Sequence, residues 1–181
     1  MPYALELRQR FTPLQNRYDL VGFRDGSETL LGYAEQKRFK LKEKITFYGS
    51  DDKSQVAFTL GARNAFEIAG KYDVCAADGT VLATIAKDPA SSLIRSTYHL
   101  VVGGRDLLGT ERTLWKALFR RFVDLPLFPI QFDVSDGGAV AIRIDRIMKI
   151  RDSYRTEVAD DAIDWRVAAA MTVAVDAFMQ R

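Results

Sequence analysis

The stretch DWRVAAAMTVAVDAFMQR (164–181) decides the fold of this protein. Between Trp165 and Met179 only Arg166, Thr172 and Asp176 are polar. A helix that is apolar on nearly all sides lies either in a protein core or in a membrane. The apolar run is about 15 residues long, whereas a helix needs about 20 to cross a bilayer. The stretch therefore predicts a helix that the rest of the protein encloses.

We expect this helix over about residues 161–179, with Asp160 or Asp161 as its N-terminal cap. An enclosed helix must let its neighbours approach closely, and the many alanines of this stretch are small enough to permit that. The side chains that we expect to be inaccessible to water are Val167, Ala170, Met171, Ala174 and Phe178.

An internal repeat indicates what encloses the helix. Each copy has a short run of alternating apolar residues, a turn of acidic and small residues, and a second run. The copies are 18–34, 45–60, 72–86, 98–113 and 130–144. Their turns centre on Asp25-Gly26, Asp52-Lys53, Asp78-Gly79, Gly103-Gly104 and Asp136-Gly137. Because Asp-Gly and Gly-Gly readily adopt the positive φ angles of tight turns, each copy predicts a β-hairpin.

The runs beside the turns alternate with a period of two. Val56, Phe58 and Leu60, for example, fall on one face of a strand. This pattern is typical of a sheet with one buried face. A further strand is expected over roughly 147–158. A meander of about ten or more strands closes into a barrel or divides into two layers, so the fold class is mainly β around the C-terminal helix.

A second helix is expected over 110–125, TERTLWKALFRRFVDL. Its apolar residues recur at helical spacing, Thr110 is suited to cap the N-terminus, and Pro126 ends the helix. The helix is amphipathic, so it either packs one face on the barrel or lies in a membrane interface.

The run QKRFKLKEKITFYGSDDKSQVAFTLGARNAFEIAGKYDVCAADGTVLATIAKD (36–88) resembles the LURP-one-related family, which shares its fold with the tubby C-terminal domain and with phospholipid scramblases. The matching features are the basic and aromatic strand 36–44, the next aromatic strand with its acidic turn, the entry Gly70-Lys71-Tyr72, and Asp78-Gly79. The resemblance implies one domain over 1–181, a closed antiparallel barrel of about twelve strands around the hydrophobic C-terminal helix. No site residue of the family maps individually onto this chain.

The sequence offers little for catalysis. His99 and Cys75 are the only residues of their types, and we interpret them as a surface or hydrogen-bonded histidine and a packed cysteine. They are too few for a zinc site. The acidic pairs Asp51-Asp52 and Asp160-Asp161 lack the order of a calcium loop, so turn and cap roles are favoured. We expect no enzyme activity, no cofactor and no metal.

The composition bears on location and partners. A net charge of +2 does not by itself predict a nucleic-acid partner. A single cysteine suits a reducing compartment, and the N-terminal sequence MPYALELRQRF has no apolar run of signal-peptide length. We therefore expect a cytoplasmic protein that attaches peripherally to a membrane.

Two segments carry the candidate binding residues. In QKRFKLKEK (36–44) one side of the expected strand bears Arg38, Lys40, Lys42 and Lys44. Clustered cations bind anionic headgroups or nucleic-acid phosphate, although lysines also serve simply to protect a strand edge.

The expected helix 110–125 adds a second group of cations, Lys116, Arg120 and Arg121, beside the aromatic residues Trp115 and Phe119. The tubby relatives bind phosphoinositides through basic residues on the barrel surface, so the resemblance implies anionic phospholipid as the ligand of both segments. Trp115 and Phe119 would then enter the membrane interface.

The expected function is a non-enzymatic membrane-surface or adaptor domain that binds anionic phospholipid headgroups and an unidentified protein. Two alternatives stay open. Scramblase-like lipid translocation would need a longer apolar helix than the C-terminal stretch supplies. A small-molecule-binding barrel or a lipid-processing enzyme would need a lumen, which the enclosed helix would fill.

Overall fold

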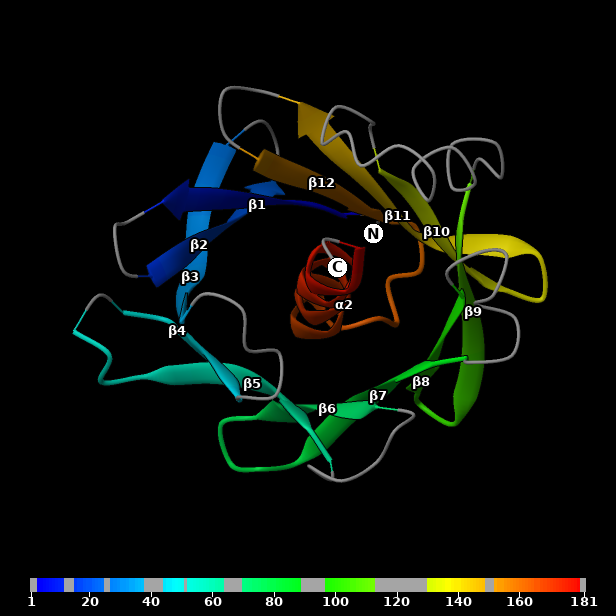
Figure 1. Cartoon of the computed structure of the whole chain (residues 1–181), viewed down its shortest axis with the longest axis horizontal. Helices are drawn as coiled ribbons and strands as arrows, with labels where there is room; N and C mark the ends of the chain where they lie inside the picture. Colours follow the sequence, from blue (N-terminus) through cyan, green and yellow to red (C-terminus); the bar gives the residue numbers. More distant parts are fainter. Residues whose placement is uncertain are drawn as a thin grey trace.

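The computed structural model describes residues 3–11, 15–24, 27–37, 44–50, 52–63, 70–88, 97–112, 130–148 and 152–179. The described chain forms a closed antiparallel barrel of twelve strands around one helix, α2 (Trp165–Met179), which occupies the centre of the ring in Figure 1. The strands are β1 (Tyr3–Phe11), β2 (Gln15–Arg24), β3 (Ser27–Lys37), β4 (Ile45–Tyr48), β5 (Val56–Ala62), β6 (Lys71–Ala76), β7 (Val81–Lys87), β8 (Thr97–Val102), β9 (Arg105–Glu111), β10 (Gln131–Asp136), β11 (Ala139–Met148) and β12 (Asp152–Val158). The predicted fold class is confirmed.

All five predicted hairpins are present, as β2–β3, β4–β5, β6–β7, β8–β9 and β10–β11. Positive φ angles occur at the predicted turns that the structure describes, with Gly79 at 89° and the pairs Gly103-Gly104 and Gly137-Gly138 between 55° and 97°, whereas Asp25-Gly26 lies outside the described residues. The Asp-Asp-Lys-Ser turn uses Lys53 at a φ of 60°. Local turn chemistry therefore set the register of these hairpins.

The barrel is closed by β1 and β12, which pair from Tyr3 with Val158 to Arg8 with Ser153. The sequence analysis did not identify β1, although Leu5 and Leu7 alternate there with Glu6 and Arg8. It expected one strand over 147–158, but the structure ends β11 at Met148 and begins β12 at Asp152. The unpredicted strand is the one that removes the last free sheet edge.

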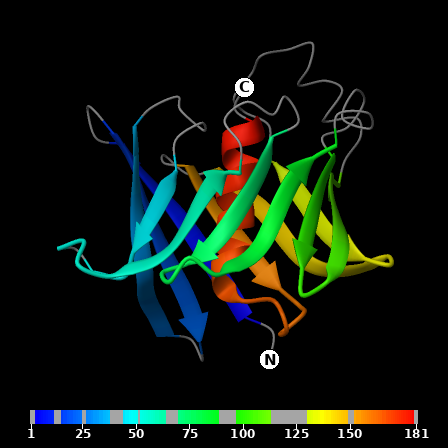
Figure 2. The same cartoon turned by 90° about the horizontal axis from the view of Figure 1, so that it is seen from below.

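The helix α2 runs along the barrel axis, as Figure 2 shows, and is buried as predicted. Val167, Ala170, Met171 and Ala174 are each at most 1% exposed, and the side chain of Phe178 lies outside the described residues. The lumen is filled by this helix, because residues 167–176 are buried without exception. This packing provides the enclosure that an all-round apolar helix requires.

The N-terminal cap is Asp164, so the predicted cap at Asp160 or Asp161 and the predicted start at 161 are wrong. The Asp164 carboxylate accepts a hydrogen bond from the backbone N–H of Arg166 at 2.9 Å. The Asp164 backbone carbonyl accepts one from the N–H of Val167 at 3.0 Å. Asp160 instead accepts the N–H of Ala162 within a turn that precedes the helix. That turn is needed because the chain must pass from the barrel wall into the lumen before the helix begins.

The predicted helix over 110–125 does not begin at Thr110. Thr110 and Glu111 belong to β9 and pair with Asp133 and Phe132 of β10. The β-branched Thr110 fits a strand as well as a cap, and pairing with a neighbouring strand decides between the two. Of the remaining stretch, Arg112 is described and 113–125 lie outside the described residues.

Candidate functional site

The two ends of the barrel have different connections. Strands β3, β5, β7 and β9 finish at one end, where β4, β6, β8 and β10 begin, and the C-terminus of α2 lies there in Figure 2. The tight turns of β4–β5, β6–β7, β8–β9 and β10–β11 lie at the opposite end with the N-terminus of α2. Side chains at neighbouring strand ends are close, because paired strands are about 4.8 Å apart.

Of the four predicted cations Arg38, Lys40, Lys42 and Lys44, the structure describes Lys44, while Gln36 and Lys37 of the predicted strand end β3. Lys44 is exposed immediately before β4, and its stem lies over Gly61 of β5, where an added Cβ would be 3.3 Å from the Lys44 Cγ. Arg38, Lys40 and Lys42 lie outside the described residues. That they share a strand face with Lys44 therefore stays a prediction. Lys44 faces outward, since Ile45 beside it is buried.

Three further cations lie at the same end and were missed by the sequence analysis. Arg63 follows β5, Lys71 begins β6 and Lys87 ends β7, and all three are exposed. Arg63 and Lys71 are adjacent, because the Arg63 N–H donates to the Lys71 carbonyl at 2.8 Å. Together with Lys44 they form what we call the cationic end of the barrel. They could have been found by aligning the strand ends of the predicted meander and counting the charges there.

The charges of the cationic end are only partly neutralised. The Arg63 guanidinium donates to both oxygens of Asp73, at 2.7 and 2.8 Å, and also to Thr84. The hydrogen bonds from Arg63 hold the pKa of the Asp73 carboxyl below its ordinary value, although partial burial acts in the opposite direction. Within the described chain, Lys44, Lys71 and Lys87 make no ion pair. Their ammonium groups are therefore available to an anion.

The side chain of Lys87 lies on a different face of the sheet from that of Lys44. It pairs in register with Tyr98, whose side chain is fully buried in the lumen, so Lys87 is on the inward face of β7. Its side chain is exposed because the strand ends at the mouth of the barrel. The cationic end thus includes both the outer rim and the mouth.

The opposite end, which we call the acidic end, carries the carboxylates of the turns. Hydrogen bonds from the Ser50 hydroxyl and from Ser54 lower the pKa of Asp52 to about 2, and the N–H of Thr80 lowers the pKa of Asp78. Asp160 is held by Arg105 at 2.7 Å, which with the N–H of Ala162 lowers its pKa as well. These carboxylates are ionised at neutral pH.

The turn carboxylates have structural roles, as the sequence analysis favoured. Asp52, Asp78 and Asp160 each accept a backbone N–H two residues further along the chain. Among the described residues no cluster of three or more His, Cys, Asp or Glu side chains is arranged to hold a metal ion.

The helix α2 is oriented so that its dipole matches this charge distribution. Its N-terminus, with partial positive charge, begins at Asp164 at the acidic end, and its C-terminus lies at the cationic end. Each helix end therefore adds a favourable interaction with the charges around it.

The second predicted group of binding residues belongs to the stretch 110–125. Lys116, Arg120 and Arg121, with Trp115 and Phe119, lie outside the described residues. The residues that flank that stretch are at the cationic end, because Arg112 follows β9 and Ile130 precedes β10. Arg112 is paired with Asp133, through contacts of 2.6 and 3.1 Å, and with Asp145.

His99 and Cys75 lie on the outer face of the barrel, His99 near the cationic end, where it pairs with Ala86 next to Lys87, and Cys75 nearer the acidic end. The His99 Nδ1 is 3.0 Å from Asp106 Oδ1, and its Nε2 is 4.0 Å from Asp88. The imidazole is 38% exposed and hydrogen-bonded, as expected from the sequence. Cys75 is a free, half-buried thiol on β6.

A family model described as LURP-one-related matches residues 31–176, most of the chain. The chain belongs to the LURP-one-related family. Neither a curated protein nor a solved structure gives a significant match. The match ends at Asp176 and so includes most of α2 of this LURP-one-related domain. None of the helices that the structure describes has the length and apolar character to cross a membrane.

Proposed function

We propose that this LURP-one-related domain binds anionic phospholipid headgroups at a membrane surface through the cationic end of its barrel. The observation that carries the proposal is the group of exposed lysines that the fold brings together at one end of the barrel. Exposed lysines without an ion pair to a described residue are at one end, and the ionised turn carboxylates are at the other. Such a molecule is oriented by an anionic surface, which attracts one end and repels the other.

The expected affinity follows from the number of cations. Each lysine near an anionic bilayer contributes about 1 kcal/mol, so Lys44, Lys71 and Lys87 together give about 3 kcal/mol. The predicted cations Arg38, Lys40 and Lys42 directly precede Lys44 in sequence and would double that value. Insertion of the predicted Trp115 and Phe119 into the interface would raise the affinity further.

The test is sedimentation of the full chain with vesicles that contain either neutral lipid alone or neutral lipid with phosphatidylserine or a phosphoinositide. Binding should require anionic lipid and weaken as salt rises. The double variant Lys44→Glu/Lys71→Glu should lose most of the binding, and Lys40→Glu/Lys42→Glu should do the same. Lys53→Glu is the matched control, because Lys53 is an exposed lysine in a turn at the acidic end.

A duplex DNA competitor distinguishes lipid from nucleic acid, since both would show a similar dependence on salt. The proposal is wrong if the charge reversals leave vesicle binding unchanged, if Lys53→Glu has the same effect as Lys44→Glu/Lys71→Glu, or if duplex DNA is preferred over anionic vesicles.

A further inference from the structure

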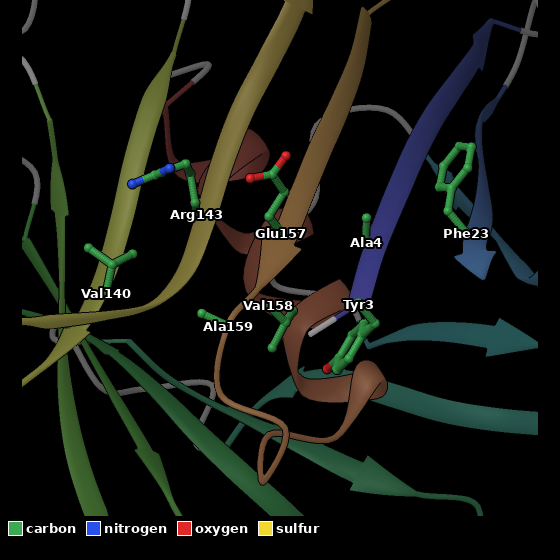
Figure 3. Close-up of a pocket in the computed structure, with 8 residues that line it drawn as sticks. All are labelled: Tyr3, Ala4, Phe23, Val140, Arg143, Glu157, Val158 and Ala159. Atoms are coloured by element: carbon green, nitrogen blue, oxygen red, sulfur yellow. The ribbon is translucent and has the colours of Figure 1, made fainter. Parts of the chain in front are cut away.

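A hollow of about 450 Å³ lies on the outer face of the barrel, over β2, β1, β12 and β11 (Figure 3). It is close to the acidic end and separate from the cationic end, since its residues come from the ends of β1, β2 and β12 and from the first half of β11. Its volume is in the range of about 300–1,000 Å³ that is usual for sites of small molecules. Its lining residues are Tyr3, Ala4, Phe23, Val140, Arg143, Glu157, Val158 and Ala159.

Strand pairing explains why the surface is hollowed there. Ala4 is paired with Phe23 on one side and with Glu157 on the other, and Glu157 is paired in turn with Arg143. The small Ala4 therefore lies between larger side chains in one row across four strands. Ala159 continues the face of Glu157 towards the acidic end. The floor is consequently made of methyl groups, and the walls are an aromatic ring and two charged side chains.

The edge of the hollow is held in place by a hydrogen bond to a buried residue beside the start of α2. The Tyr3 hydroxyl donates to the carbonyl of Ile163, just before α2, at 2.7 Å. Burial and the nearby Asp164 and Asp160 raise the pKa of this phenol, so it stays protonated as a donor. The hollow is thus supported by the same contacts that fix the start of the helix.

The guanidinium of Arg143 makes no hydrogen bond to a described residue. Its contact with a described carboxylate is 3.7 Å, from Nε to Asp133 Oδ1, which is too long for a hydrogen bond. That carboxylate already accepts two hydrogen bonds from Arg112. Arg143 therefore presents donors that a ligand carboxylate or phosphate would accept, and a guanidinium can bind such a group through two parallel hydrogen bonds.

Glu157 offers the opposite charge beside it. Its carboxylate is 3.3 Å from the Arg155 Nε, in a pair of which both side chains are at least half exposed, and such surface pairs contribute little. Figure 3 shows the heads of Arg143 and Glu157 diverging from neighbouring positions on β11 and β12. A positive and a negative side chain therefore start from neighbouring strand positions beside an apolar floor.

We propose that this hollow binds a small zwitterion that carries an apolar group. Its anionic group contacts Arg143, its ammonium group contacts Glu157, and its apolar group lies on Ala4, Phe23 and Val140. A free apolar amino acid has this chemistry, and so does an ethanolamine phospholipid. The site is independent of the cationic end, so it stands or fails separately from the function proposed above.

The probe is L-phenylalanine, added to the isotope-labelled full chain and followed by NMR chemical shifts, with short-chain phosphatidylethanolamine as the lipid source in a parallel titration. We expect binding of about 1 mM, weak because the hollow is open. Shifts should concentrate at Ala4, Phe23, Val140, Arg143 and Glu157. Phenylalanine amide, which lacks the carboxylate, and N-acetylphenylalanine, which lacks the ammonium, should each bind about tenfold more weakly.

Variants connect each charge to its partner. Arg143→Gln should weaken phenylalanine about tenfold and leave the amide unaffected, and Glu157→Gln should weaken phenylalanine and leave the N-acetyl form unaffected. Lys53→Gln, at an exposed turn residue that is not part of the lining of the hollow, should change nothing. The proposal is overturned if neither zwitterion shifts the lining residues, or if the two derivatives bind wild type as well as phenylalanine does. The derivative comparison uses the unaltered protein, so it does not depend on the variants folding.

Discussion

The inner and outer faces of the barrel are built from alternate residues of the same strands, and they differ in the interactions that their side chains make. In β11, Ile142 and Ile144 are fully buried, whereas the Arg143 side chain between them is 46% exposed. The inner face contacts α2 on every side, so each residue there affects the packing of the whole core. The outer face carries charges whose individual contributions to stability are small. Stability therefore depends on the inner face, and the outer face and the two ends are free to carry binding residues.

One buried polar cluster joins α2 to the inner face of the barrel. Asp176 of α2 is 1% exposed and accepts hydrogen bonds from the hydroxyls of Tyr18 and Tyr154, on β2 and β12. One turn earlier, Thr172 shares a hydrogen bond of 2.6 Å with Thr156. A buried carboxylate is costly unless its oxygens are satisfied. These contacts fix both the rotation and the depth of the helix in an otherwise apolar lumen.

The largest effect should come from removing the helix. A chain that ends after Asp161 loses buried groups such as Val167, Met171 and Val175, each large apolar side chain contributing about 1.5–3 kcal/mol. The loss is comparable with the whole usual stability of about 5–15 kcal/mol, so the truncated chain should not fold. Circular dichroism and urea titration measure this, and a soluble chain with a cooperative transition would contradict the enclosure of α2.

Asp176→Ala should have the next largest effect. It leaves two buried tyrosine hydroxyls without this acceptor, at a cost of about 1–3 kcal/mol each. Asp176→Asn retains the volume and one acceptor oxygen and should cost less. The outer-face control is Asp106→Ala, which should change stability by no more than about 0.5 kcal/mol. Equal midpoints in urea for Asp176→Ala and Asp106→Ala would show that the cluster does not matter.

Gly109→Val tests the closeness of the wall to the helix. A Cβ at Gly109 would lie 2.8 Å from the Phe132 ring and 3.3 Å from the Met171 Cε, so the added side chain must displace core groups, at about 1–3 kcal/mol. Leu108→Ala on the same strand removes an outward side chain that is 45% exposed, and its effect should be small. Thermal unfolding of the two variants compares the faces directly, and a melting temperature for Gly109→Val near that of wild type would disprove the close contact.

The smallest effect concerns pH at the outer face. Arg63 lowers the pKa of Asp73, so the pair stabilises the fold above the ordinary carboxyl pKa of 3.8 and loses that contribution as pH falls through the lower folded value. Because Arg63 is 46% exposed, solvent screening limits the contribution to less than about 1 kcal/mol. Asp73→Asn should therefore lower the urea midpoint slightly at pH 7 and not at pH 2. A difference that persists undiminished at pH 2 would refute the ion pair as its source.

The local features of the chain were predictable because they depend on neighbouring residues. The turn residues and the alternation beside them predicted the five hairpins, and the lack of a polar face on 164–181 required that helix to be enclosed. The cap was misplaced to Asp160 or Asp161 because three aspartates occur close together, and only the path of the chain into the lumen selects Asp164. Thr110 was assigned to a helix because its pairing with Asp133 is a contact between distant residues.

The sequence by itself determined the fold class, the turns and the buried helix, since alternation, turn residues and all-round apolarity act over a few residues. Only the tertiary structure decided which side chains meet. It brought Lys44, Arg63 and Lys71 to one end of the barrel, placed Asp176 between Tyr18 and Tyr154, and set Arg143 beside Glu157 above Ala4. Closure of the barrel through β1 and β12 fixes these neighbours, because it joins the first and last strands and so depends on the register of every strand between them.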